Sequence, residues 1–399
     1  MKVIKTLLAV IGVAAAVSCG NKGDKVSIPI LAWYSIPAEY ASEETYQELA
    51  DAGFNINFSH IGGFDDALKA LELGEKTGVK IMFTCSELST DPEATVMKVK
   101  DHPALYGYFL RDEPAVRDFP GLAAWAERIK AVDDTHPLYL NLFPNYAPDE
   151  VLGCTYPEYV HRFVEEVGLP LLSFDFYPVT VEGIRGNWWN NLEVIAKEAR
   201  EAGIPFWAFA LSTAHHPYPS ATIQSLRLQF YTDLAYGAQG LQYFTYWCPT
   251  PGTWDFNNAP IGETGVRGPV YDIVKEMNTE LQARAEVFMG AKVKMVRHTG
   301  ETIPSGVTRL EELPSQVKSL DTHGKGAVVS VLENKGWGYL MIVNRSLDEA
   351  FDYDVAFNVP VKQVCRGGEV KKGPQRRSIP SRGRRLRHIP LEIIKRALI

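Results

Sequence analysis

The sequence predicts an α/β protein, a (β/α)8 TIM barrel followed by a small C-terminal antiparallel β-domain. Three observations favour this class. Between residues 28 and 249, apolar runs of strand length alternate with amphipathic runs of helix length, and glycines follow the helical runs where left-handed caps are expected. Eight such repeats over about 220 residues match the size of a (β/α)8 barrel. Beyond residue 291, short stretches alternate between apolar and polar residues, which is typical of antiparallel strands.

The strands and helices of the predicted barrel, residues 26–290, follow one another in a regular order. The eight strands are expected at 28–36, 54–61, 79–85, 105–110, 138–142, 169–176, 205–211 and 240–247. Helices are expected at 42–52, 65–77, 119–131, 156–166, 189–202, 223–236 and 271–288. The main alternative is a doubly wound sheet, whose first strand would lead into a glycine-rich phosphate loop. Here residues 32–37 read Ala-Trp-Tyr-Ser-Ile-Pro, which cannot serve as such a loop.

The C-terminal part of the chain changes character twice. Residues 291–372 predict the small β-domain, with strands at 328–332, 338–343 and 352–357. Residues 373–399 are rich in arginine, and Glu392 is their only acidic residue. No final alternating strand is evident there, so we interpret this segment as a basic tail, disordered or non-native in sequence. The alternative is a tail that binds an acidic glycan or a membrane surface.

The first 25 residues have the features of a bacterial lipoprotein signal peptide and tether. Lys2 and Lys5 precede an apolar stretch, 7–17, that is too short to span a bilayer. Small residues then lead to Cys19, the predicted site of lipidation; an ordinary signal peptide is the alternative. We therefore expect an exported protein, lipid-anchored to a bacterial membrane on its periplasmic side or at the cell surface. The net charge of −7 argues against nucleic acid as a partner.

The segment 105–115 carries the strongest functional signal. An apolar run, typical of a buried parallel strand, ends abruptly in Arg111, Asp112, Glu113 and Pro114. In a (β/α)8 barrel, ionisable groups at the C-terminal tips of strands form the active site. The alternative is a strand end whose charges are simply solvated.

The other strand tips predict a mouth lined with aromatic and carboxyl groups. Cleavage of a glycosidic bond needs such a combination, because one carboxyl group protonates the leaving oxygen and a second acts as nucleophile or activates water. Asp175 follows the sixth strand and is the candidate for the second carboxyl group. The expected substrate-binding residues are Trp33, Tyr34, Arg111, Asp112, Asn141, Tyr177, Trp207, His215, Tyr246 and Trp247.

Other chemistries have weaker support in the sequence. His215 and His216 are adjacent, so on a strand they would point in opposite directions and could not share one metal ion. Ser212 lacks the Gly-x-Ser-x-Gly elbow of a serine hydrolase. No loop resembles a phosphate cradle, and we expect neither a metal nor another cofactor.

Three segments resemble the clan A glycoside hydrolases, especially the β-galactosidase-like barrels of Bacteroidetes lipoproteins. They are Asp112-Glu113-Pro114, which looks like that clan's Asn-Glu-Pro after the fourth strand, the run 226–238, and Phe244-Thr-Tyr-Trp247. The resemblance covers roughly residues 28–288. It implies that Glu113 is the general acid/base, that Asp112 replaces an asparagine that contacts the sugar, and that Trp247 is the sugar platform.

The chain departs from that clan at the seventh strand. The clan places its nucleophilic glutamate there, whereas residues 207–216 contain no carboxylate. Either Asp175 supplies the second carboxyl group, or the site has lost its nucleophile. The first case predicts a glycoside hydrolase acting on an oligo- or polysaccharide. The second predicts a non-catalytic carbohydrate-binding barrel for glycan capture at the cell surface.

Overall fold

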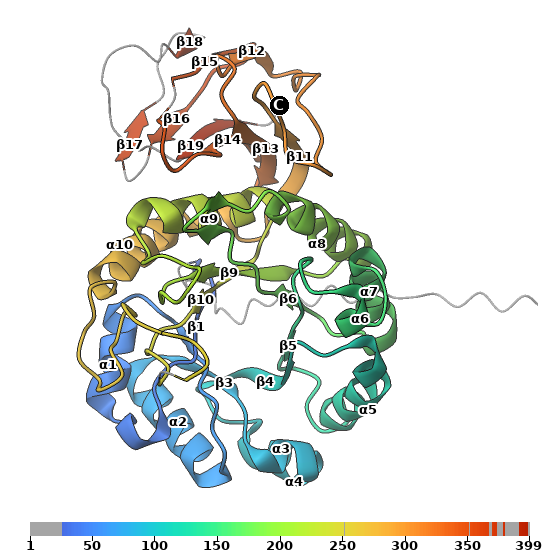
Figure 1. The fold of residues 1–399 in the computed structure, drawn as a ribbon, viewed down its shortest axis with the longest axis vertical. Helices are drawn as coiled ribbons and strands as arrows, with labels where there is room; N and C mark the ends of the chain where they lie inside the picture. Colours follow the sequence, from blue (N-terminus) through green and yellow to red (C-terminus); the bar gives the residue numbers. More distant parts are fainter. Residues whose placement is uncertain are drawn as a thin grey trace, which may run out of the picture.

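The computed structural model describes residues 26–250, 252–350, 352–366, 369–372, 378–379 and 391–397. A ring of helices surrounds a barrel of strands, and a β-domain lies against one side of the ring (Figure 1). The predicted (β/α)8 barrel with a small C-terminal antiparallel β-domain is confirmed. The signal segment and Cys19 lie outside the described residues, so lipidation and anchoring stay predictions. Along the part of the chain that the structure describes, no helix is long and apolar enough to cross a bilayer.

Eight parallel strands form the barrel in the order β5-β4-β3-β2-β1-β10-β9-β6. A parallel bridge between Leu142 and Phe174 joins β5 to β6 and closes the barrel. The strands are β1 (Ile30–Trp33), β2 (Ile56–Asn57), β3 (Lys80–Phe83), β4 (Leu105–Asp112), β5 (Leu138–Asn141), β6 (Leu172–Phe174), β9 (Phe206–Leu211) and β10 (Gly240–Phe244). A short hairpin, β7 (Val179–Thr180) and β8 (Gly183–Ile184), follows β6 at the barrel mouth.

The helices begin and end largely where the sequence predicts. Ser42 and Thr222 cap two of them through reciprocal bonds with Thr45 and Ser225, and Gly203 ends a third in the left-handed conformation. The expected helix 271–288 is divided into two. The helices are α1 (Glu43–Asp51), α2 (Phe64–Thr77), α3 (Ser86–Thr90), α4 (Pro92–Val99), α5 (Phe119–Lys130), α6 (Asp149–Leu152), α7 (Tyr156–Arg162), α8 (Trp188–Ala202), α9 (Ile223–Tyr236), α10 (Tyr271–Gln282) and α11 (Ala285–Phe288).

Successive side chains of each barrel strand enter two separate cores. The outer core, between strands and helices, receives residues such as Leu110, Leu140 and Tyr243. The inner core fills the barrel and consists largely of aromatic and large aliphatic side chains. It contains Leu31, Trp33, Ile56, Phe58, Met82, Phe109, Tyr139, Leu171, Tyr177, Trp207, Phe209 and Leu211. Membership of one core or the other therefore reports which way a strand residue faces.

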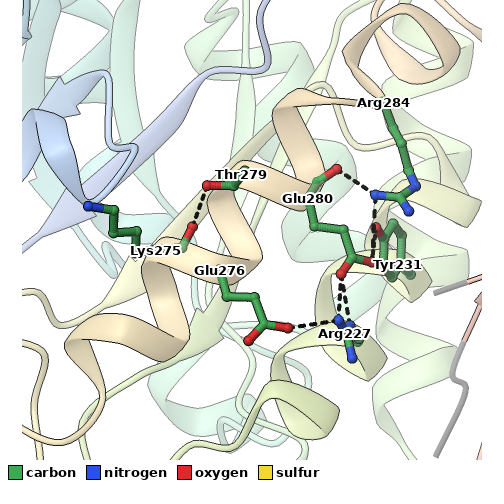
Figure 2. Close-up of polar contacts among 7 residues, drawn as sticks. All are labelled: Arg227, Tyr231, Lys275, Glu276, Thr279, Glu280 and Arg284. Atoms are coloured by element: carbon green, nitrogen blue, oxygen red, sulfur yellow. Dashed lines mark hydrogen bonds and ion pairs between the residues drawn. The ribbon is translucent and has the colours of Figure 1, made fainter. Parts of the chain in front are cut away.

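A buried ion cluster joins α9 to α10 (Figure 2). Glu280 accepts bonds from Arg227 and from the Tyr231 hydroxyl, at 2.7 Å in each case, and Arg284 lies 3.7 Å away. Glu276 adds a bond to Arg227 from the exposed side. Several donors are needed to offset the desolvation of a buried carboxylate, and this cluster supplies them.

The β-domain contains a six-stranded sheet, in the order β11-β13-β14-β19-β16-β17, and a three-stranded sheet, β12-β15-β18. Its strands are β11 (Lys292–His298), β12 (Val317–Asp321), β13 (Ala327–Asn334), β14 (Trp337–Asn344), β15 (Asp354–Phe357), β16 (Gln363–Arg366), β17 (Glu369–Lys372), β18 (Ser378–Ile379) and β19 (Leu391–Ala397). The sequence predicts a basic tail over 373–399 with no final strand, whereas the structure places β19 between β14 and β16. The rest of that segment, apart from β18, lies outside the described residues.

Helix α9 packs directly against the β-domain. The Ser330 hydroxyl on β13 donates to the Ala235 carbonyl at 2.7 Å, and the Tyr236 hydroxyl bonds His298 of β11 at 2.9 Å and Glu193 of α8 at 3.1 Å. Because one face of α9 meets β9 and the other meets β13 and β14, the helix is buried on nearly all sides.

Candidate active site at the barrel mouth

A β-bulge in β4 determines which way its charged tip faces. Phe109 pairs with Tyr139, but the next paired residue is Arg111, so Leu110 is the extra residue. Asp112 consequently pairs with Asn141 and faces the barrel axis, while Arg111 pairs with Leu140 of the outer core. Without the bulge, strict alternation from Phe109 would turn Arg111 inward and Asp112 outward. Bulges next to active sites commonly re-aim side chains in this way.

Glu113 follows with an unusual backbone conformation. Its φ of 43° lies in the left-handed region, which a residue with a side chain rarely adopts. The Glu113 N–H donates to the Asn141 carbonyl at 2.8 Å and holds this turn against β5. Such strain costs of order 1–3 kcal/mol and is concentrated at functional sites.

The amide of Asn141 joins the carboxyl groups of two strand tips. Its Nδ2 donates to Asp112 Oδ1 at 3.1 Å and to Asp175 Oδ1 at 3.0 Å. Asp175 follows β6 and faces the same axis. A side-chain hydrogen bond also joins Asp175 to Glu113. Asp112, Glu113 and Asp175 therefore meet at one point, and Asn141, at 2% exposed, is the buried support beneath them.

A second layer of polar side chains fixes the orientation of the Asn141 amide. The Ser173 hydroxyl donates to Asn141 Oδ1 at 3.0 Å, so the NH₂ group must face the carboxyl groups. Gln242 Nε2 donates to Ser173 Oγ at 2.8 Å, and Gln242 Oε1 accepts from the Tyr139 hydroxyl. This chain crosses the barrel from β5 through β6 to β10. Polar groups that are fully paired inside a core hold a single arrangement.

Burial and mutual repulsion favour the protonated forms of these carboxyl groups. Burial, with a contribution from the Asp112 charge, raises the pKa of Glu113 to about 7, although the bond to Asp175 lowers it. Burial raises the pKa of Asp112 to about 6, although the hydrogen bond from Asn141 lowers it. The Asp112 side chain reaches solvent, but protein surrounds it on the barrel side. The pKa of Asp175 is raised by burial, then by the charges of Glu113 and Asp112. A general acid for neutral pH needs such a shift.

The seventh strand contributes no ionisable group to this cluster. Its inward position at the tip is Leu211, which is 5% exposed and belongs to the inner core. Ser212 and Thr213 follow, and their hydroxyls donate to the Thr245 carbonyl at 2.7 and 3.2 Å. The inward-facing side chain at the tip of β9 is thus apolar.

Aromatic rings from the sixth, seventh and eighth strand ends form a wall beside the carboxyl groups. The Tyr177 ring lies 5.4 Å from Phe244 and 5.8 Å from Tyr218, measured between centroids. His215 packs on Tyr218 at 4.8 Å and on Phe256 at 4.7 Å. Tyr177 and His215 therefore lie at the mouth, and so does half-buried Tyr34, whose ring is 5.8 Å from that of His60; substrate contact by these residues stays a prediction.

Four of the aromatic side chains predicted to bind substrate are buried within the inner or the outer core, which corrects that assignment. Trp33 is 3% exposed and fills the barrel between Phe58 and Phe209. Trp207 is near the N-terminal end of β9, at the opposite end of the barrel. Tyr246 and Trp247 belong to the outer core, because the chain leaves β10 after Phe244. Trp247 packs against Tyr40, with ring centroids 4.9 Å apart.

Arg111 is also outside the cluster. It is exposed on the outward side of β4, and no ion pair joins it to Asp175 among the residues that the structure describes. Sequence reasoning missed Ser173, Gln242 and Phe244. Side chains two residues apart on a strand face the same way. Ser173 is two residues before Asp175, so its inward direction could have been predicted, and the same spacing relates Gln242 to Phe244.

The comparisons with known proteins bear on the fold. No protein-family model matches the chain, and no curated protein matches it. Among solved structures, β-galactosidase from Bacillus circulans sp. alkalophilus is 10% identical with a TM-score of 0.60, over 94% of this chain and 99% of that one. β-Galactosidase from the psychrophilic Marinomonas ef1 is 10% identical (TM-score 0.49; 65% of this chain, 60% of that one). Xylanase 10B from Thermotoga maritima is 14% identical (TM-score 0.44; 65% and 97%).

The chain thus spans only 60% of the length of the Marinomonas enzyme but nearly all of the Bacillus enzyme. At these identities the likeness concerns the fold alone. These structural neighbours are glycoside hydrolases, and this chain has the barrel and β-domain fold of the Bacillus enzyme.

Proposed function

We propose that this protein is an exported, lipid-anchored glycoside hydrolase that cleaves an O-glycosidic bond in an oligo- or polysaccharide. The observation that carries the proposal is the meeting of Glu113 and Asp175 over the Asn141 amide at the C-terminal end of the barrel. Two carboxyl groups in different protonation states are what glycosidic cleavage requires. The Bacillus enzyme with the same fold is a β-galactosidase, which favours the same reaction class.

Glu113 would act as the general acid. With its pKa near 7, Glu113 is partly protonated at neutral pH and can pass its proton to the glycosidic oxygen as the bond breaks. In the absence of substrate the two carboxyl groups share a hydrogen bond in which Asp175 donates, because this bond lowers the pKa of Glu113 while the charge of Glu113 raises that of Asp175. The carboxyl groups are thus closer than the ~5–5.5 Å of retaining enzymes, and a bound sugar would have to enter between them.

Asp175 would supply the second carboxylate, as nucleophile or as the base that activates water. Asp175 must be ionised in this role, and the Asn141 amide, whose bond lowers the pKa of Asp175, would stabilise its charge. Tyr177, Phe244 and Tyr218 would contact the sugar ring faces. Export and anchoring rest on the N-terminal segment and Cys19.

A carbohydrate-binding barrel without turnover is the second candidate. The apolar Leu211 at the tip of the seventh strand favours it, because that strand contributes no nucleophile. Both candidates predict carbohydrate binding at the same mouth, so only turnover separates them.

The deciding experiment measures hydrolysis and binding of one oligosaccharide panel by wild type, Glu113→Gln and Glu263→Gln. Glu263 is an exposed carboxylate in a loop beyond β10 and serves as the matched control. We expect Glu113→Gln to lose about 10²–10⁴-fold in turnover while still binding, and Glu263→Gln to retain activity. Binding by all three proteins with no hydrolysis by wild type would establish the capture protein instead.

A further inference from the structure

Arg185 occupies an unusual position at the rim of the barrel mouth. It follows the β7–β8 hairpin, and its N–H donates to the Pro178 carbonyl at 2.9 Å. Its guanidinium lies over two tyrosine rings, 4.8 Å from the centroid of Tyr146 and 5.2 Å from that of Tyr218. Tyr146 comes from the loop after β5 and Tyr218 from the loop after β9. Three loops therefore hold this one cation in place.

The guanidinium of Arg185 makes no hydrogen bond or ion pair within the described part of the chain. Other arginines differ in this respect: Arg128, Arg162 and Arg227 each bond a carboxylate, and Arg345 bonds carbonyl oxygens. A guanidinium has five N–H donors arranged for two-point contact with a planar anion. Contact with two ring faces restrains the guanidinium and leaves those donors available.

Tyr146 links Arg185 to the segment that carries Asp175. Burial and then the charge of Asp175 raise the pKa of the Tyr146 hydroxyl, and the charge of Arg185 lowers it. The Tyr146 ring is 5.1 Å from Phe176, the residue after Asp175. A sugar whose bond is cleaved between Glu113 and Asp175 could therefore extend one substituent over Tyr146 to Arg185.

We propose that Arg185 binds an anionic substituent of the substrate, the carboxylate of a uronic acid or a sulfate ester, on the sugar beside the cleaved bond. The inference rests on the proposed function and narrows its substrate class. Three carboxyl groups in one site repel an anionic substrate. An enzyme that acts on acidic glycans therefore needs a positive charge near its substrate-binding site. Arg185 supplies this charge in a fixed orientation.

The test compares binding and turnover on three oligosaccharide series of equal length: neutral, uronate-containing and sulfated. Binding is measured in the Glu113→Gln background, and turnover is measured with Glu113 intact. Arg185→Gln should weaken binding of one anionic series by about 10- to 100-fold, with a matching rise in KM, and change neutral binding less than about twofold. Arg185→Lys should recover only part of the loss, because lysine lacks the planar fork.

Arg117→Gln is the matched control, since Arg117 is an exposed arginine on the same side of the barrel and its loss changes the charge equally. Thermal unfolding of each variant shows whether the hairpin keeps its structure. The anionic series whose binding is weakened by Arg185→Gln shows whether Arg185 binds a carboxylate or a sulfate. Equal loss on neutral and anionic sugars, or preferred binding of neutral sugars, would overturn the inference while turnover still upheld the glycosidase. Arg185-dependent binding of anions without any turnover would overturn the glycosidase and uphold the inference.

Discussion

Asn141 is the residue on which the geometry of the candidate site depends. One amide group bonds two carboxyl groups, and its oxygen is engaged by Ser173, so the amide has a single orientation. The neighbouring Asp112 then acts mainly through its charge. At about 6, its pKa lies below that of Glu113, so Asp112 ionises first and holds the proton on Glu113 to higher pH.

Asp112→Asn should therefore shift the pH dependence of catalysis. Removing the Asp112 charge lowers the pKa of Glu113 from about 7, so the acid form of Glu113 is lost at lower pH. The alkaline limb of kcat/KM against pH should move to lower pH, and turnover at pH 8 should fall more than turnover at pH 5. Asp66→Asn, at an exposed position on α2, makes the same charge change far from the mouth and should leave the limb in place. An unmoved limb in Asp112→Asn would contradict this electrostatic role.

At the scale of single elements, α9 has the most demanding environment. It is buried on nearly all sides, and its one basic residue, Arg227, turns toward α10 and the ion cluster of Figure 2. The side chains of Arg284 and Glu280 are each 5% exposed. An ion pair so little hydrated is costly to form and still more costly to break from one side.

Glu280→Ala should destabilise the protein by about 3–5 kcal/mol, because it leaves buried cationic and hydroxyl groups without their acceptor. Denaturant unfolding followed by circular dichroism measures this difference. Glu276→Ala removes a 59%-exposed carboxylate that also bonds Arg227, and it should cost less than about 1 kcal/mol. Similar losses in the two variants would mean that burial does not govern this cluster.

The stability of the whole molecule should depend on the protonation of Asp233. This residue of α9 is fully buried, and neither of its carboxyl oxygens has a hydrogen-bond partner in the described structure. Burial raises its pKa well above the usual range. The folded protein then holds a proton that the unfolded chain releases above its ordinary pKa of about 3.9, so stability falls as pH rises between the two values.

Asp233→Asn keeps the shape of the side chain and removes the free-energy cost of keeping this carboxyl group protonated in the folded state. The variant and the wild type should be similarly stable near pH 4, and the variant should gain about 1.4 kcal/mol for each pH unit above that, up to the folded-state pKa. Thermal or urea unfolding between pH 4 and 8 measures the difference. Asp348→Asn, at an exposed turn of the β-domain, should show no such slope. A stability difference that does not change with pH would argue against a neutral Asp233.

The fold was predictable because local patterns determine it. Apolar runs with the length of strands alternate with amphipathic runs with the length of helices. This local pattern specifies the eight repeats without reference to how the barrel closes. The tips of β4 and β6 were predictable for the same reason, since Asp112, Glu113 and Asp175 each follow an apolar run. Strand β19 was not predictable from 373–399, because its place in the sheet depends on pairing with β14, about 50 residues away in the chain.

What only the tertiary structure decided is the direction in which each tip residue faces. Strand side chains alternate with period two, so one bulged residue, Leu110, exchanges the positions of Arg111 and Asp112. The end of β10 likewise places Phe244 at the mouth and buries Tyr246 and Trp247. The Arg185 site needs loops after β5, β6 and β9 at once. The sequence by itself thus determined the barrel and its candidate carboxyl groups, which depend on local periodicity, whereas the arrangement of the mouth depends on hydrogen-bond register between strands far apart in the chain.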